Sequence, residues 1–242
     1  MKTIEVYAHR GYSAVAPENT MAAFRRAADV QAEGLEFDVH RTKDRQLVVI
    51  HDETVQRTTG ASGKVRELTL DELRRLDAGS WFSDDFRGEK IPTLEKVLRL
   101  AADTGMKVNI ELKNNKFRYP GMEQDVMERV DRFGLIGKAV LSSFNHYSLR
   151  EVKERYPEVD TAILYMASLY EPWNYAKAVG VSSIHSYWPT MEKGMVEACR
   201  KEGLPVRAFT VNRVRVMRRM IEWGVDALIS DQVERLQQEL KG

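Results

Sequence analysis

The feature that most constrains the fold is a repeated order of local patterns: a helix-like segment, a glycine, and then a short apolar strand. A glycine just past a helix end adopts the left-handed conformation without a steric penalty and so ends the helix. The glycines that stand in this position are Gly34, Gly105, Gly137, Gly180, Gly203 and Gly224. Strands that alternate with helices in this way favour parallel βαβ units.

Eight apolar segments follow this pattern and are expected to be core strands. The predicted strands are Ile4–Ala8, Leu35–Val39, Met106–Leu112, Ala139–Ser142, Thr161–Leu164, Val181–Ile184, Pro205–Phe209 and Val225–Ile229. Eight units in 242 residues favour an α/β fold of the (β/α)8 TIM-barrel type, since such barrels typically have about 250 residues. A Rossmann sheet is disfavoured because no G-x-G-x-x-G motif follows the first strand.

One connection, from Asp52 to Ile91, is too long for an ordinary loop in a barrel. Thr69 and Glu72 have the spacing of a capping box and predict a short helix within it. We therefore expect a single catalytic domain over residues 1–242, with residues 53–91 as a small insertion after the second strand. The insertion should lie over the C-terminal face of the barrel, where barrel enzymes keep their active sites.

The charge balance and the cysteine content exclude several classes of protein. The chain has 37 Lys and Arg against 36 Asp and Glu, so it offers no basic field for nucleic acid. The arginine-rich run 213–219 is read as the solvated face of a helix. The single cysteine, Cys199, excludes an internal disulfide framework and a cysteine-based zinc site.

The sequence shows no targeting or membrane-spanning segment. Residues 1–6 enter a predicted strand at once, without the long apolar region of a signal peptide. No apolar stretch approaches the length of a bilayer span. We therefore expect a cytoplasmic protein without stable membrane insertion, and the sequence leaves its oligomeric state open, with a homodimer as one option.

Carboxylates gather on one side of two predicted strands. Side chains alternate along a strand, so Glu36 and Asp38 share one face of the second strand. Glu111 shares the polar face of the third strand with Lys113, and in a barrel the polar face points inward. Taken singly, each carboxylate is more easily read as a helix cap or a salt-bridge partner. Together, Glu36, Asp38 and Glu111 predict a site for a divalent metal, Mg²⁺ or Ca²⁺.

Cations and histidines stand around this predicted metal site. Arg10 and Lys113 are suited to binding a phosphate group, the first as a planar fork and the second as a point charge. His9 and His51 end apolar runs and could serve as general acid and general base. These residues predict metal-assisted cleavage of a phosphate ester.

The order of motifs along the chain resembles the glycerophosphodiester phosphodiesterases. The resemblance rests on His9-Arg10-Gly11, Pro17-Glu18-Asn19-Thr20, Glu36-x-Asp38, Thr42-Lys43-Asp44, His51-Asp52, Arg57-Thr58-Thr59-Gly60, Glu111-x-Lys113, Phe209-Thr210-Val211-Asn212 and residues 224–231. It implies a TIM barrel with a small insertion and a Ca²⁺ or Mg²⁺ ion on Glu36, Asp38 and Glu111. It also implies His9 and His51 as the acid–base pair, and Arg10 and Lys113 as contacts of the phosphate or the metal site. In that family the glycerol 2-hydroxyl is thought to attack phosphorus, and water then opens a cyclic phosphate.

Two positions depart from the family pattern. Phe209 stands where the family often has tryptophan. The phenylalanine keeps an aromatic wall for the substrate but weakens stacking on it. Arg45 replaces the usual glycine of the Thr-Lys-Asp-Gly turn. The lone Cys199 also argues against the disulfide-bonded venom branch.

Other candidates have weaker support. His185 is read as the end of a strand and could contact substrate or serve a structural role. Tyr187 and Trp188 could line the pocket mouth. His40 is expected to be solvated, His146 to cap a helix or lie at the surface, and Asn19 to cap the first helix.

The sequence thus favours a metal-dependent hydrolase that releases sn-glycerol 3-phosphate and an alcohol from glycerophosphodiesters such as glycerophosphocholine or glycerophosphoethanolamine. One alternative is a lysophospholipase D that acts on acylated lysolipids. Another is a catalytically inert barrel that binds glycerophosphodiesters. A sugar-phosphate isomerase is less well supported, because no glycine-rich phosphate loop follows the last two strands. The preferred alcohol and the choice between Ca²⁺ and Mg²⁺ stay open.

Overall fold

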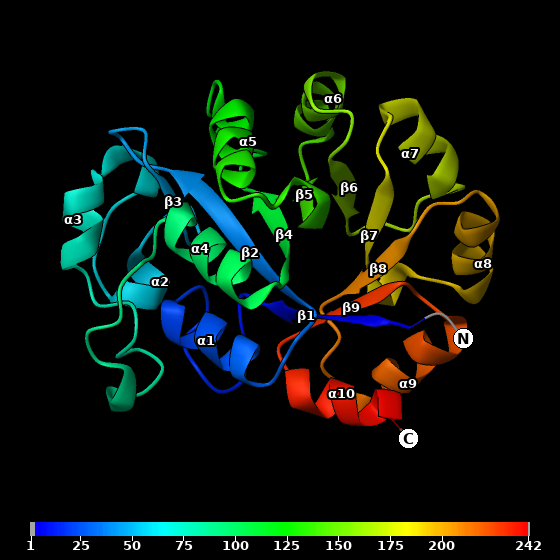
Figure 1. The fold of residues 1–242 in the computed structure, drawn as a ribbon, viewed down its shortest axis with the longest axis horizontal. Helices are drawn as coiled ribbons and strands as arrows, with labels where there is room; N and C mark the ends of the chain where they lie inside the picture. Colours follow the sequence, from blue (N-terminus) through cyan, green and yellow to red (C-terminus); the bar gives the residue numbers. More distant parts are fainter. Residues whose placement is uncertain (1–2, 242) are drawn as a thin grey trace.

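A computed structural model describes residues 3–241; residues 1, 2 and 242 of the predicted domain lie outside this range. Eight parallel strands form a closed ring, seen in Figure 1. They are β1 (Glu5–His9), β2 (Gly34–Arg41), β4 (Lys107–Leu112), β5 (Ala139–Ser143), β6 (Asp160–Tyr165), β7 (Ser183–Tyr187), β8 (Val206–Phe209) and β9 (Ala227–Ser230). The ring closes because β1 pairs with both β2 and β9. The predicted TIM barrel is confirmed.

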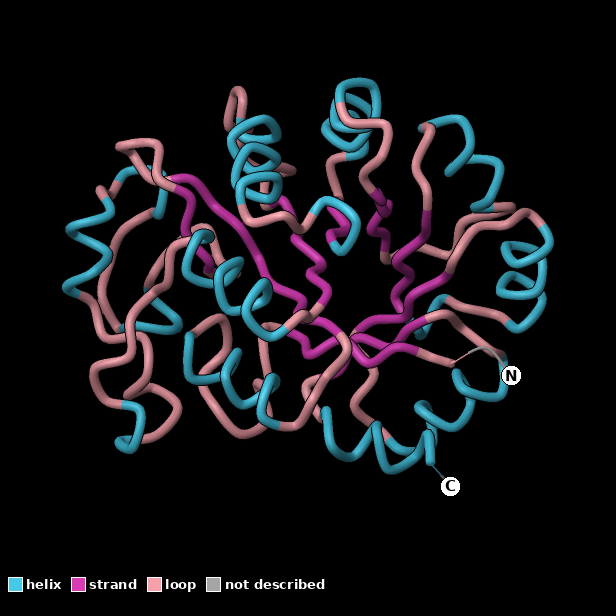
Figure 2. Tube along the Cα trace, viewed as in Figure 1, coloured by secondary structure: helices cyan, strands magenta, loops and turns pink. Residues whose placement is uncertain are grey.

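Helices pack around the outside of the ring, as Figures 1 and 2 show. They are α1 (Met21–Asp29), α4 (Leu94–Thr104), α5 (Met122–Arg132), α6 (His146–Arg155), α7 (Pro172–Val179), α8 (Lys193–Lys201), α9 (Val214–Trp223) and α10 (Val233–Lys241). Their apolar faces meet the outward-pointing side chains of the strands, such as Leu35, Phe37 and Ile110, which are fully buried. Among the described helices, none combines the length and the apolar character that a bilayer span requires.

The glycine pattern is confirmed at four positions and wrong at two. Gly105, Gly180 and Gly224 are left-handed C-caps, and Gly203 also has positive φ. Gly34 instead begins β2, where a Cβ atom would lie 2.4 Å from the Tyr7 ring, so it serves close packing. Gly137 lies within a short 3-10 turn, η3 (Ile136–Lys138).

Residues 47–91 depart from the regular alternation. A ninth strand, β3 (Leu47–Val49), returns antiparallel to β2 and carries the chain into α2 (Gln56–Thr59), η1 (Val65–Glu67), α3 (Leu70–Arg75) and η2 (Asp84–Phe86). Thr69 and Glu72 form the predicted capping box at α3. This segment packs on an apolar cluster of its own that includes Val55, Val65 and Leu73, beside the ring in Figure 1.

Two details of local backbone structure correct or explain the sequence analysis. Thr20, and not Asn19, caps α1, because the Thr20 side chain accepts a hydrogen bond from the Ala23 amide. Arg45 has φ +62, the left-handed region that glycine adopts at lower cost, which explains the glycine usual at this turn in the family.

Candidate active site

Three buried carboxylates meet at the C-terminal ends of neighbouring strands. Glu36 and Asp38 lie on β2, and Glu111 lies opposite Asp38 in the register of β4. One oxygen from each lies within 4.8 Å of the others. The alternation of side chains therefore placed all three correctly on the inner face of the barrel.

The electrostatics of this cluster fit a cation. Burial, with the neighbouring Asp38 carboxylate, raises the pKa of Glu36 to about 8. Burial also raises the pKa of Glu111. Burial opposes ionisation of Asp38 as well, but Lys113 and Arg10 outweigh it and hold the pKa of Asp38 well below its usual range. A group of buried oxygen ligands that resists full ionisation is suited to a hard divalent ion, which would stabilise all three anions.

Two fixed cations stand at the edge of the cluster. The Lys113 Nζ atom lies 2.8 Å from Glu111 Oε1 and 3.6 Å from Asp38 Oδ1. The Arg10 side chain donates to Glu18 at 2.9 Å, and its backbone amide donates to Glu36 Oε2 at 3.0 Å. Arg10 Nε is buried without a hydrogen-bond partner and lies 3.5 Å from Asp38 Oδ2, so the guanidinium charge faces the carboxylate cluster.

His9 lies at the end of β1, next to the cluster. Its Nδ1 atom lies 2.6 Å from Asp231 Oδ1, and its Nε2 atom lies 3.9 Å from Glu36 Oε2. Burial lowers the pKa of His9, but the hydrogen bond to Asp231 and the charge of Glu36 outweigh burial and leave the pKa raised. Asp231 thus fixes the ring orientation and leaves Nε2 free to exchange a proton.

His51 has the same arrangement on the other side of the site. Its Nδ1 atom lies 2.7 Å from Asp52 Oδ1. Arg57, from α2, donates to both Asp52 oxygens and to Glu18. The hydrogen bond from Arg57 is the largest influence on Asp52 and lowers its pKa to about 2. The insertion therefore holds the carboxylate that orients His51.

Aromatic rings stand over the barrel mouth. Phe209, at the end of β8, lies 6.0 Å from the Tyr187 ring and 6.4 Å from the Phe144 ring. Phe144 follows β5, which is not a neighbour of β8, so the contact crosses the mouth of the ring. Trp188 lies against the Arg219 guanidinium, which places it beside α9.

Two histidines lie elsewhere than the sequence analysis expected. His40 is fully buried instead of solvated, because β2 extends to Arg41 and the β3 strand covers it. Burial lowers the pKa of His40 to about 4, and its Nδ1 atom lies 3.0 Å from the Tyr119 hydroxyl. His185 lies in the middle of β7 and is fully buried; its part in substrate binding stays a prediction.

Three residues of the site were missed by sequence reasoning. Asp52 and Asp231 orient the two histidines, and Asn19 donates to Asp38 Oδ2 at 2.9 Å. Asp52 directly follows His51, and Asp231 directly follows the last strand; both positions were available as signals. Asn19 has φ +55 and is buried, which aims its amide at the cluster and not at the helix start.

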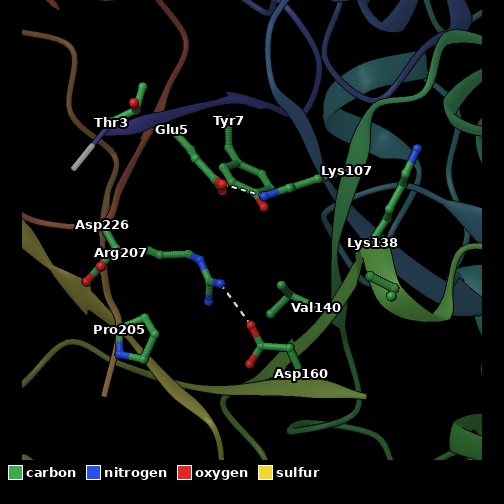
Figure 3. A pocket seen from close by; sticks show the side chains of 12 residues that line it. Thr3, Glu5, Tyr7, Lys107, Lys138, Val140, Asp160, Pro205, Arg207 and Asp226 are labelled. Carbon is green, nitrogen blue, oxygen red and sulfur yellow. Dashed lines mark hydrogen bonds and ion pairs between the residues drawn. The ribbon is translucent and has the colours of Figure 1, made fainter. Parts of the chain in front are cut away.

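A second cavity, of about 180 Å³, lies at the opposite end of the barrel (Figure 3). Two ion pairs line it. The Arg207 side chain contacts Asp160 at 2.8 Å, and Lys107 pairs with Glu5. Figure 3 shows these two pairs facing each other across the cavity.

Comparisons with known proteins agree with this geometry. Residues 9–235 match the glycerophosphoryl diester phosphodiesterase family. The glycerophosphodiester phosphodiesterase of Caldanaerobacter subterraneus subsp. tengcongensis is 45% identical over 236 residues, covering 98% of this chain and 97% of the relative. That of Bacillus altitudinis is 37% identical over 246 residues, covering 98% of this chain and 99% of the relative.

A solved structure with the same fold holds a reaction product. It is an Oleispira antarctica phosphodiesterase in complex with the product sn-glycerol-3-phosphate, with a TM-score of 0.89 and 28% identity, and the match covers 99% of this chain and 98% of that one. The motif order, the barrel and the match over nearly the whole chain lead to one conclusion. The chain belongs to the glycerophosphodiester phosphodiesterase family.

Proposed function

We propose that this protein is a metal-dependent phosphodiesterase that hydrolyses glycerophosphodiesters to sn-glycerol 3-phosphate and an alcohol. The observation that carries the proposal is the arrangement of one buried carboxylate cluster with two histidines, each oriented by a carboxylate of its own. The product held by the Oleispira relative supports the substrate class. The proposal treats residues 1–242 as one catalytic domain, with 53–91 as an insertion over its C-terminal face.

Glu36, Asp38 and Glu111 are proposed to hold Ca²⁺ or Mg²⁺. When bound, such an ion polarises phosphoryl oxygens and offsets their negative charge. Metal–oxygen distances near about 2.1 Å would identify Mg²⁺, and distances near about 2.4 Å would identify Ca²⁺.

His9 and His51 are proposed as the acid–base pair. One imidazole takes the proton from the attacking hydroxyl, and the other returns a proton to the oxygen of the leaving alcohol. Asp231 and Asp52 keep the two rings in the tautomer that presents Nε2 to the reaction. The charge of Asp52 is in turn fixed by Arg57.

The remaining residues bind the substrate. Arg10 and Lys113 are proposed to hold the phosphate oxygens, because both cations lie against the edge of the carboxylate cluster. Phe209 is proposed as an aromatic wall for the substrate, and His185 as a further substrate contact.

The test is release of glycerol 3-phosphate from glycerophosphocholine and glycerophosphoinositol with added metal. We expect His9→Ala and His51→Ala each to lower kcat about a hundred- to ten-thousandfold, as is usual for a lost acid or base. EDTA should abolish turnover. Arg218→Ala, at an exposed position of α9 outside the site, is the control. Wild-type rates in either histidine variant would refute the mechanism.

Two alternatives are decided by the same assay. Met166, Leu169 and Tyr170 are exposed in the loop after β6, and this apolar rim would favour acylated lysolipids as substrates of a lysophospholipase D. Faster turnover of acylated than of headgroup-only substrates would support that activity. Binding of substrate without turnover, with metal present, would support an inert binding protein instead.

A further inference from the structure

A hollow of about 390 Å³ lies beside the site, on the rim formed by the ends of β4 and β5. It is lined by Asn115, Arg118, Phe144, Asn145, His146, Tyr147 and Tyr175. None of these residues has a part in the chemistry described above.

The hollow lies next to the active site, as its position along the chain and one aromatic contact show. Asn115 is two residues beyond Lys113, so at most about 7 Å of chain separates their Cα atoms. Phe144 lines the hollow and also contacts Phe209 over the barrel mouth. The Phe144 ring is therefore a wall shared by the site and the hollow.

The inner residues of the lining are held by hydrogen bonds, and its outer edge is exposed to solvent. Asn145 caps α6 and donates to the Asn114 carbonyl at 3.1 Å. His146 is held between the Tyr175 hydroxyl, at 2.8 Å, and the Leu164 carbonyl, at 2.9 Å. Tyr147 is 80% exposed at the outer edge. An open hollow suits the variable part of a diester, since the glycerol part must stay at the reacting phosphate.

The chemistry of the lining selects among possible alcohols. Aromatic rings can bind either a quaternary ammonium group or the C–H faces of a polyol. A cation would need an unopposed negative charge nearby. Among the described residues that line the hollow, Arg118 carries the one permanent charge, and it is positive. Its partner, Glu151, lies 3.4 Å away, and both side chains are more than half exposed.

We propose that this hollow binds the leaving alcohol and prefers an uncharged polyol, such as inositol or glycerol, to choline. The polyol lies on Tyr147 and Tyr175, and its hydroxyl groups bond to Asn115 and Arg118. This inference rests on the proposed phosphodiesterase activity.

The first test compares kcat/KM for glycerophosphoinositol and glycerophosphocholine. We expect the wild type to favour the inositol substrate about tenfold, because the described lining offers hydrogen-bond partners to a polyol and no unopposed negative charge to choline. Tyr147→Ala should lower kcat/KM for the inositol substrate about tenfold and for choline less than twofold. Arg118→Gln should raise the choline value relative to inositol. Arg218→Ala, at an exposed position of α9 outside the lining, should change neither ratio.

A wild-type preference for choline that Tyr147→Ala removes would overturn the proposal and show an aromatic cage for a cation. Equal effects of Tyr147→Ala on both substrates would also overturn it.

A second test does not depend on turnover. Binding of glycerophosphoinositol in EDTA is measured by calorimetry for wild type and Tyr147→Ala. Weaker binding in the variant supports the hollow as a binding site, whether or not the substrate is hydrolysed. Absence of hydrolysis by the wild type would refute the proposed function and leave the hollow untouched. Unchanged affinity overturns the hollow alone.

Discussion

The two ends of the barrel handle charge in opposite ways. At the C-terminal end six carboxylates face three permanent cations. The carboxylates are those of Glu18, Glu36, Asp38, Asp52, Glu111 and Asp231, and the cations are Arg10, Arg57 and Lys113. At the N-terminal end Glu5 pairs with Lys107, and Asp160 pairs with Arg207. Charges of opposite sign are paired at the N-terminal end of the ring. At the C-terminal end the excess of carboxylates suits the binding of a cation.

The excess is costly to the protein without its ligand. Buried carboxylates that repel one another raise each other's pKa, as Glu36 shows. Stability at this end is therefore traded for binding of a cation, while the ion pairs at the opposite end carry no such repulsion.

The largest expected effect comes from neutralising one carboxylate of the cluster. Glu36→Gln should lower kcat about a thousandfold, since loss of a metal ligand removes several kcal/mol of transition-state stabilisation. In EDTA the same variant should have a higher Tm than wild type, because repulsion with Asp38 is gone. Steady-state assays and thermal denaturation check both results.

Metal titration supplies the control for this variant. Wild-type Tm should rise with added Ca²⁺ or Mg²⁺, since a ligand of the native state stabilises it. Glu36→Gln should lose that rise. If it instead keeps both the rise and full activity, the cluster is not the metal site.

At the N-terminal end we expect the reverse result, a loss of stability with little change in kcat. Arg207 is buried, and Arg207→Met leaves the partly buried Asp160 without its partner, which should cost about 3 kcal/mol of unfolding free energy. Its kcat should stay within about twofold of wild type, since the pair lies far from the reacting groups. Urea denaturation and the phosphodiesterase assay measure the two quantities.

Removing both charges of the pair should recover part of the stability that is lost in Arg207→Met. Because a pair replaced by apolar residues is often nearly neutral, Asp160→Leu with Arg207→Met should be more stable than Arg207→Met alone. A double variant that is less stable would show that the pair acts through other contacts, such as the Arg207 hydrogen bond to Ser183.

The smallest expected effect is a loss of stability at acid pH that is due to His185, a histidine buried inside the barrel. Burial, with the nearby Arg207 charge, holds the pKa of His185 well below its unfolded value of 6.5. The unfolded state therefore binds the extra proton first, so the stabilising contribution is complete above pH 6.5 and is lost as pH falls below it. Between pH 7.5 and 5.5 the loss should be about 1.4 kcal/mol.

Urea denaturation of wild type and His185→Gln at the two pH values isolates this contribution. The difference in stability between the two proteins should shrink at pH 5.5, because glutamine does not titrate. A difference that does not depend on pH would contradict the buried, neutral state of His185.

Much of the barrel and its carboxylate cluster could be predicted because both follow from local patterns. Alternation along β2 and β4 is enough to place Glu36, Asp38 and Glu111 on one inner face. The strands were found because each apolar run is bounded by glycine or by a helix-like segment. These signals require no knowledge of the tertiary structure.

The rest depends on contacts between distant parts of the chain. Asp231 contacts His9 only because β9 pairs with β1, and nothing near residue 231 in the sequence points to a histidine. His40 was expected in solvent because the antiparallel β3 strand was not predicted. Asn19 was read as a cap because its left-handed backbone conformation cannot be seen in the residue type alone.

The contact between His9 and Asp231 joins positions 222 residues apart. A ribosome makes a chain from its N-terminus, so His9 and all three metal carboxylates exist well before Asp231 does. Until β9 is made and docks on β1, the proposed acid–base residue has no carboxylate to orient it. Full activity therefore requires ring closure, because the pairing of β9 with β1 also brings Asp231 to His9.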